Sequence, residues 1–192
     1  MRGDLGAGSG EVHDMAQAVL DFWFGEVPAE KRFARDDGLD RTVAGRFGAM
    51  REAVLGSEAS GWRDDPNTLL AAIILLDQFS RNIHRDDSEA FAGDALALGL
   101  AKEAIERGWD ETLAPERRAF LYMPLMHAED RETQTTSLAC FERLGDDENL
   151  FYAREHADVI ARFGRFPSRN PALGRPSTPE EEAYLSRLGA GW

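Results

Sequence analysis

His127 and Asp130 are the first pair of side chains in this chain that could do chemistry together. They stand three positions apart in the segment PLMHAED, a spacing that puts both on one face of a helix and within reach of one ligand. An imidazole beside a carboxylate is the minimum requirement for a general base. The segment lacks the second histidine of the H-E-x-x-H zinc motif, so we expect no metal site, and the alternative role is a structural, hydrogen-bonded histidine.

His156 lies on the apolar face of the segment LFYAREHADVIARF. Burial disfavours a charged imidazolium, so this histidine is expected to be neutral and hydrogen-bonded in the core. An enzyme hypothesis gives the histidines a different role. Either His127 or His156 would act as a general base, oriented by Asp77 or Asp130, with or without the help of a metal.

An apolar run, residues 69–76, is followed at once by the polar side chains of Asp77, Gln78, Arg81 and Asn82. The run is apolar on every side, which is typical of a buried helix. Asp77 and Arg81 stand four positions apart on one helix face, and charges near a core are stable only when they are paired. We expect these two residues to form either a structural ion pair between helices or the floor of a binding pocket.

Basic residues gather near the C-terminus, in the segment GRFPSRN and the LGRP that follows it. Arg165, Arg169 and Asn170 lie in the first part, and Arg175 lies in the second. Arginine side chains and free backbone N–H groups near the start of a helix favour anions. The segment therefore predicts an anion site, or else an ordered loop whose arginines pair with the protein's own carboxylates.

Helical spacing of apolar residues and helix-capping signals cover most of the chain. Capping boxes begin at Asp14, Asp86 and Thr178, and Asp65 precedes a proline at the first helical position. Pro124 lies inside a predicted helix and should kink it. The predicted helices cover residues 14–25, 38–56, 67–82, 86–107, 115 to beyond 130, 136–144, 150–163 and a short stretch after 178.

These elements predict an all-α fold of seven or eight helices stacked as antiparallel pairs, either a tetratricopeptide-like α-α superhelix or a compact bundle. The segment DALALGLAKEAIERGWD resembles the second helix of a tetratricopeptide unit, although no clean 34-residue period appears. The Gly-rich residues 1–12 are expected to form a flexible N-terminal segment. Residues 13–192 are expected to form a single α-helical domain.

The composition argues against several classes of function. The 192 residues include 22 Lys and Arg against 35 Asp and Glu, which gives a net charge of −13. Nucleic acids and anionic membranes are bound by clustered positive charge, so we expect neither as a partner. The single cysteine, Cys140, excludes an intramolecular disulfide framework and a Cys-rich zinc module. Neither a spanning helix nor a secretory signal is evident, so we expect a cytoplasmic protein without a cofactor.

Five motifs in combination resemble a bacterial family of unknown function, domain-of-unknown-function family 924. They are LDFWFG (20–25), DQFSRN (77–82), PLMHAED (124–130), GRFPSRN (164–170) and LGRPSTPEE (173–181), in the order of that family. The resemblance covers nearly everything after residue 15 and implies an all-helical, tetratricopeptide-like fold, but no activity, substrate or catalytic residue. The family's usual pattern has histidine where this chain has Ser168, whose hydroxyl can donate a hydrogen bond but cannot titrate near neutrality.

Three functions are compatible with these residues. The leading hypothesis is a helical protein that binds a small anionic molecule or a peptide end in a concave polar site, with Arg165 and Arg169 holding the anion. The candidate site residues are Asp77, Gln78, Arg81, Asn82, His127, Asp130, His156, Arg165, Arg169 and Asn170. The alternatives are a hydrolase-type enzyme and a protein–protein interaction module. In the module, Trp62, Trp109 or Trp192 would anchor a partner, unless these side chains pack over helix ends.

Overall fold

The most apolar segment of the sequence forms the centre of the fold. In the computed structural model, which describes residues 9–188, α3 (Pro66–Ile73) continues through a π-helical turn, η3 (Ile74–Phe79), into α4 (Ser80–Ile83). Every side chain from position 68 to position 80 is buried, which confirms the predicted burial of residues 69–76 and extends beyond it. These three elements therefore form one continuous helical segment in the core.

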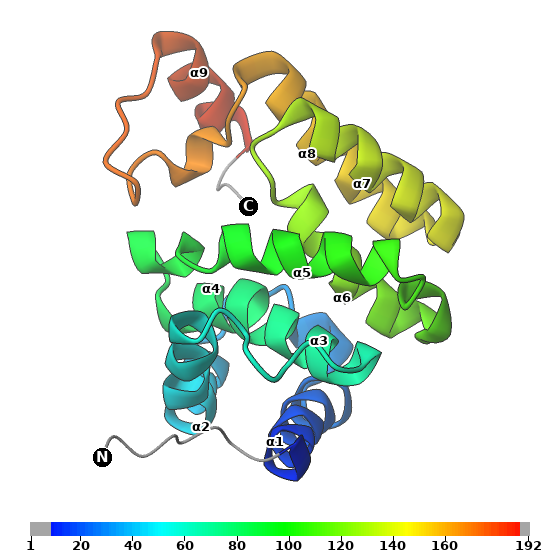
Figure 1. The fold of residues 1–192 in the computed structure, drawn as a ribbon. Helices are drawn as coiled ribbons and strands as arrows, with labels where there is room; N and C mark the ends of the chain where they lie inside the picture. Colours follow the sequence, from blue (N-terminus) through cyan, green and yellow to red (C-terminus); the bar gives the residue numbers. More distant parts are fainter. Residues whose placement is uncertain (1–8, 189–192) are drawn as a thin grey trace.

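Helices on several sides bury this central segment (Figure 1). α3 contacts α1 (Ser9–Asp21), α5 (Asp94–Glu106) and α6 (Pro115–Met126), and η3 and α4 contact α2 (Asp37–Gly56). α7 (Arg131–Leu144) packs against both α6 and α8 (Asp147–Phe163), and α9 (Pro179–Leu188) contacts the turn η6 (Pro167–Arg169).

Short turns connect the helices. Besides η6, they are η1 (Phe22–Glu26), η2 (Ala29–Lys31), η4 (Ser88–Phe91) and η5 (Asp110–Thr112). The described residues contain no strand, which confirms the all-α class.

The apolar side chains form two separate clusters. The large one joins α1 to α8 around the central segment. The small one contains Val159, Ile160 and Phe166, with Phe163 and Tyr184 packed against it, so it joins the end of α8 to α9. Among residues 9–188, no helix has both the length and the apolar character needed to cross a bilayer.

Capping hydrogen bonds confirm the predicted starts of two helices. Asp65 accepts hydrogen bonds from the backbone N–H groups of the second and third residues of α3. At the other end of the chain, Thr178 and Glu181 cap α9 reciprocally. The N–H of Thr178 donates to Oε2 of Glu181 at 2.8 Å, and the N–H of Glu181 donates to the Thr178 hydroxyl at 3.2 Å. The predicted helix over 38–56 corresponds to α2.

The N-terminal helix begins earlier than predicted. α1 starts at Ser9, so Asp14 lies inside the helix rather than at its cap. Of the segment expected to be flexible, residues 1–8 lie outside the described residues and residues 9–12 belong to α1. Val12 packs into the core, and its burial favours helix in a stretch whose glycines disfavour it.

The predicted helix over 86–107 is two elements instead of one. Asp87, not Asp86, caps the short turn η4, and α5 begins only at Asp94. Gly93 separates them, at a point where a Cβ atom would lie 2.7 Å from the carbonyl oxygen of Leu76. The chain therefore breaks where it crosses closely over the central segment, a tertiary contact that helix signals do not encode.

The prediction of one continuous helix from Pro115 to beyond Asp130 was also wrong. α6 ends at Met126, and Asp130 is the N-cap of α7, accepting a hydrogen bond from the N–H of Thr133 at 2.7 Å. α7 consequently begins five residues before the predicted start at position 136. The capping chemistry of Asp130 was available in the sequence, but its spacing from His127 had suggested a different role.

The tryptophans proposed as anchors of a partner take mainly packing roles. Trp62 is buried, and Trp109 is half-buried against the main apolar cluster, as the packing alternative predicted. Trp192 lies outside the described residues.

Candidate functional site

The π-helical turn η3 places two consecutive polar residues in the interior. Asp77 is only 1% exposed and Gln78 is 8% exposed. The amide nitrogen of Gln78 donates to Oδ2 of Asp77 at 2.5 Å and lies 3.4 Å from the sulfur of Met123 on α6. Single π-helical turns of this kind often occur at functional sites. The carboxylate of Asp77 is thus oriented by its own neighbour in the sequence.

Asp77 joins the central segment to the C-terminal end of α6. Its Oδ1 atom lies 2.7 Å from Nδ1 of His127 and 3.0 Å from Nη1 of Arg81. Arg81 also donates to the backbone oxygen of Asp77 at 2.7 Å. Burial works against the charged carboxylate, but the charge of Arg81 and the hydrogen bonds from His127 and Gln78 hold the pKa of Asp77 below its ordinary value. The predicted Asp77–Arg81 pair is therefore present, and the tertiary structure adds His127 to it.

Arg81 shares a second carboxylate, Asp94, with Arg169. Arg81 donates to the two oxygens of Asp94 at 2.9 and 3.0 Å, and Arg169 donates to Oδ2 at 3.2 Å. The guanidinium of Arg169 also lies 4.8 Å from the ring centroid of Phe91 and 4.6 Å from that of Phe166. Two arginines from distant parts of the chain thus converge on the first residue of α5.

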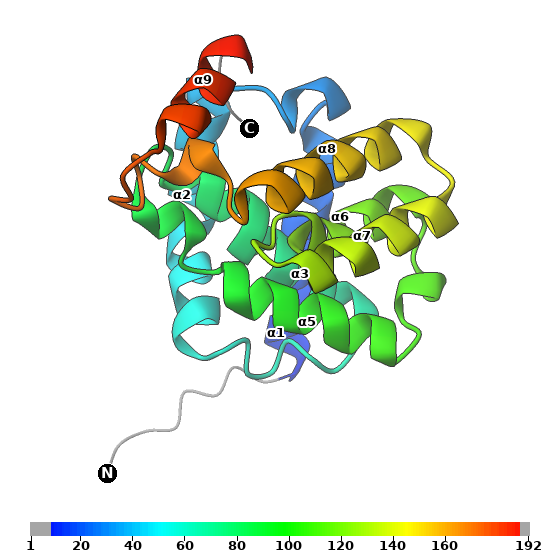
Figure 2. The same cartoon turned by 90° about the horizontal axis from the view of Figure 1, so that it is seen from above.

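Arg169 completes the ring of contacts around the histidine. Its Nη2 atom donates to the backbone oxygen of His127 at 3.0 Å, where α6 ends. Burial, together with repulsion from Arg81, lowers the pKa of Arg169 to about 10. The segment between α8 and α9, which carries Arg169, is thereby fastened beside the start of α5 (Figures 1 and 2).

The imidazole ring of His156 lies next to that of His127. The two ring centroids are 5.9 Å apart, and the ring of Phe166 packs edge-on against His156 at 5.4 Å. Nδ1 of His156 lies 2.8 Å from the backbone oxygen of Tyr152, which accepts its proton. Burial, with a further contribution from His127, lowers the pKa of His156 to about 3. The imidazole is therefore neutral near pH 7, in agreement with the sequence.

Six of the ten candidate residues thus meet in one place. We call them, together with Asp94, the histidine cluster; its members are Asp77, Gln78, Arg81, Asp94, His127, His156 and Arg169. Within the cluster, two arginines balance two carboxylates. The side chains at its edge are partly exposed, by 17% for His127 and 22% for Asp94.

Other candidate residues are engaged elsewhere. Arg165 donates to both carboxylate oxygens of Glu181, at 2.6 and 2.8 Å, and Asn170 donates to the same carboxylate at 3.3 Å. This is the arrangement of the alternative prediction, in which loop arginines pair with the protein's own carboxylates. Asn82 donates to Asp40 at 2.7 Å.

Asp130, as described above, is exposed at the N-cap of α7 and does not share a contact with His127. It was expected to face one ligand together with that histidine, on the assumption of a continuous helix. That assumption is wrong, because α6 ends at Met126 and α7 begins at Arg131. His127 and Asp130 lie between these two helices, so helical spacing does not place them on one face.

The sequence analysis did not single out two carboxylates, Asp94 and Glu129, that hold this region together. Nothing in the local pattern of Asp94 points to arginines 13 and 75 positions away. Glu129 accepts two hydrogen bonds from Arg175, at 2.6 and 2.9 Å, and one from the N–H of Phe166 at 2.7 Å. Both Glu129 and Arg175 lie inside the motifs quoted above, and that placement was the available signal.

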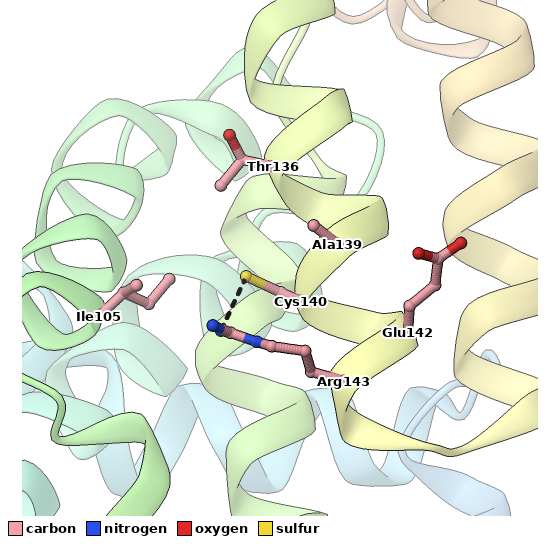
Figure 3. Close-up of a pocket in the computed structure, with 6 residues that line it drawn as sticks. All are labelled: Ile105, Thr136, Ala139, Cys140, Glu142 and Arg143. Atoms are coloured by element: carbon pink, nitrogen blue, oxygen red, sulfur yellow. Dashed lines mark hydrogen bonds between the residues drawn. The ribbon is translucent and has the colours of Figure 1, made fainter.

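Two open hollows lie between α5 and α7 rather than at the histidine cluster. The larger, of about 530 Å³, is lined by Cys140 and Arg143 among other side chains (Figure 3). The Arg143 guanidinium points toward Sγ of Cys140, 3.7 Å away, and burial raises the pKa of that thiol. The second hollow lies beside Lys102 and Asp130. Within residues 9–188, no group of three or more His, Cys, Asp or Glu side chains is arranged to hold a metal.

Comparison with known proteins gives a family without an assigned activity. A family model described as bacterial protein of unknown function (DUF924) matches residues 19–189. The solved structure of a protein of unknown function from Agrobacterium tumefaciens is 38% identical, covers 92% of this chain and 99% of its own, and superimposes with a TM-score of 0.87. No curated protein matches.

Proposed function

The chain belongs to this bacterial family of unknown function, DUF924, and from the geometry of its own residues we propose that it binds a small anionic molecule at the histidine cluster and exchanges a proton with it through His127. The proposal combines ligand binding with general acid–base chemistry. It places the reacting nitrogen on His127 and assigns Asp77 the role of a positioning residue.

The hydrogen bond between His127 and Asp77 carries the proposal. An ionised carboxylate accepts the Nδ1 proton of the imidazole, so in the neutral ring the lone pair is on Nε2. Because Asp77 is itself held by Gln78 and Arg81, the ring orientation is fixed before any ligand arrives. The side chain of His127 is 17% exposed, so part of it reaches solvent. These are the properties of a general base that is oriented by a second group.

The arginines supply the preference for an anion. Arg81 and Arg169 are 23% and 12% exposed, and both stand next to His127. Guanidinium groups bind carboxylates and phosphates through two parallel hydrogen bonds, and this is strongest where water is partly excluded. An anionic group of a ligand would therefore lie beside the imidazole.

The direct test of binding is differential scanning fluorimetry with a panel of small carboxylates and phosphates. A true ligand at 100 times its Kd should raise the Tm of the wild-type protein by about 5–10 °C. H127Q should reduce this shift, because the ligand loses its contact with Nε2 but keeps its contacts with the arginines. R162Q should keep the full shift, because Arg162 belongs to an exposed ion pair with Glu180 outside the cluster. A shift that is as large in H127Q as in the wild-type protein, or a panel without a single binder, would contradict the proposal.

Proton exchange is tested separately by nitrogen NMR of the histidine side chains, with the His127 signals assigned by their loss in H127Q. In the neutral ring of the free protein, the proton should reside on Nδ1 and the lone pair on Nε2. Addition of a panel member that binds should move the Nε2 signal. An Nε2 signal that does not respond to a bound ligand would rule out His127 as the proton-exchanging group.

A further inference from the structure

We propose that Arg81 and Arg169 form a carboxylate subsite, and that the side chain of Asp94 occupies the place of the ligand's carboxylate. This inference rests on the proposed function and gives the chemical class of the ligand. In the absence of a ligand, the Asp94 carboxylate would accept the hydrogen bonds of the two arginines. A ligand carboxylate would displace Asp94 and accept those hydrogen bonds in its place.

The contacts of Asp94 are those of a bound carboxylate. Arg81 approaches with both Nη atoms, each on a different oxygen, at 2.9 and 3.0 Å. Arg169 adds a third hydrogen bond, at 3.2 Å to Oδ2. A planar fork facing two oxygens in this way matches a carboxylate better than it matches a spherical ion such as chloride.

Both arginines are held by groups other than Asp94. Arg81 also contacts the backbone oxygen and Oδ1 of Asp77. Arg169 donates to the backbone oxygen of His127 and lies between the rings of Phe91 and Phe166. Removal of the Asp94 carboxylate therefore leaves both guanidinium groups held by their other partners, with one compensating negative charge fewer.

Repulsion between the two arginines supports this picture. The proximity of Arg81, in addition to burial, lowers the pKa of Arg169 to about 10. An anion between them relieves the repulsion, whichever molecule supplies it. Asp94 is 22% exposed, so an entering carboxylate can reach its position from solvent.

The exchange requires only a rotation of the Asp94 side chain. The backbone just before Asp94 is closely packed, because a Cβ atom at Gly93 would lie 2.7 Å from the carbonyl oxygen of Leu76. α5 can therefore stay in place while the carboxylate turns outward. A ligand carboxylate on the two arginines would lie next to His127, whose backbone oxygen Arg169 contacts.

The test is anion rescue of D94A, with acetate, phosphate or chloride titrated at constant ionic strength. Acetate should raise the Tm of D94A saturably, by about 3–5 °C at ten times its Kd, and exceed both phosphate and chloride. The double variant D94A/R169Q should lose this gain. If D94A does not fold in chloride, its refolding yield in acetate replaces Tm as the readout, and failure to refold in both salts overturns the proposal.

A matched control is E103A. Glu103 also bridges two arginines, Arg63 and Arg107, but both of these are exposed at the surface. Its removal should bring no acetate-specific stabilisation, because solvent screens the exposed charges. Equal rescue of E103A and D94A, or rescue of D94A by phosphate or chloride as strong as by acetate, would overturn the carboxylate subsite.

The two proposals fail separately. Acetate binding between Arg81 and Arg169 does not use Nε2 of His127, so D94A/H127Q should be rescued like D94A. If His127 proves inert toward ligands but this rescue occurs, the subsite stands and the proton-exchange function falls. If His127 responds to ligands but D94A shows no acetate preference, the reverse holds.

Discussion

Nδ1 of His127 lies 2.7 Å from Oδ1 of Asp77, although the two residues stand 50 positions apart in the chain. Asp77 comes from a π-helical turn in the core, and His127 is the C-cap residue directly after α6. The carboxylate is 1% exposed and the imidazole 17% exposed. This contact joins a buried carboxylate to a partly exposed histidine side chain. The stability of the buried charge and the proposed proton exchange both depend on it.

Replacement of Asp77 by Asn keeps the shape of the side chain but removes its charge. The variant D77N should lower the free energy of unfolding by about 3–5 kcal/mol at pH 7, because the partly buried Arg81 loses part of its compensation at a fully buried position. Urea denaturation measures the change. E180Q, which breaks an exposed pair with Arg162, serves as the control and should change stability by less than about 1 kcal/mol. Equal effects of the two substitutions would contradict the role of Asp77.

Acidification should destabilise the protein through His156. Its pKa is lowered to about 3 in the folded state, so between pH 6.5 and 3 the unfolded chain binds this proton and the folded protein does not. The contribution of His156 is present above pH 6.5 and is lost progressively as the pH falls toward 3. The stability of H156Q should therefore fall less steeply, by up to about 1.4 kcal/mol per pH unit. Thermal unfolding of both proteins across this range is the measurement, and parallel curves would refute the prediction.

Two glycines of the α5 region offer a matched pair of substitutions. G93A introduces a Cβ atom 2.7 Å from the carbonyl oxygen of Leu76, and should cost about 1–3 kcal/mol of stability. G99A, in the interior of α5, meets nothing within 4 Å and should stabilise by about 0.5–1 kcal/mol. Chemical denaturation compares the two. A tolerated alanine at position 93 would mean that the crossing over η3 is looser than described.

The thiol of Cys140 should be unreactive in the native protein. The residue is 3% exposed and burial raises the pKa of the thiol, so the thiolate is scarce at pH 8. We expect labelling by a disulfide reagent to be at least about 100-fold slower in buffer than in 8 M urea, because native labelling requires local opening. Similar rates in both conditions would show that the hollow beside Arg143 gives direct access to the sulfur.

The sequence by itself determined the helical class and much of the local capping. Asp65 before Pro66, and Thr178 three positions before Glu181, encode helix starts because the hydrogen bonds involved span two or three residues. The pairing of Asp77 with Arg81 was equally accessible, since one helical turn brings the two side chains together.

Only the tertiary structure decided which residues complete the histidine cluster. Arg169 reaches Asp94 across 75 positions, and His127 reaches Asp77 across 50, through the packing of α5, α6 and the segment after α8 around the central helix. The same packing broke two predicted helices, at Gly93 and after Met126, and left Asp130 as a cap. Spacing along one helix fixes contacts within a few residues, whereas contacts between helices depend on which apolar faces meet, and the local pattern does not specify that.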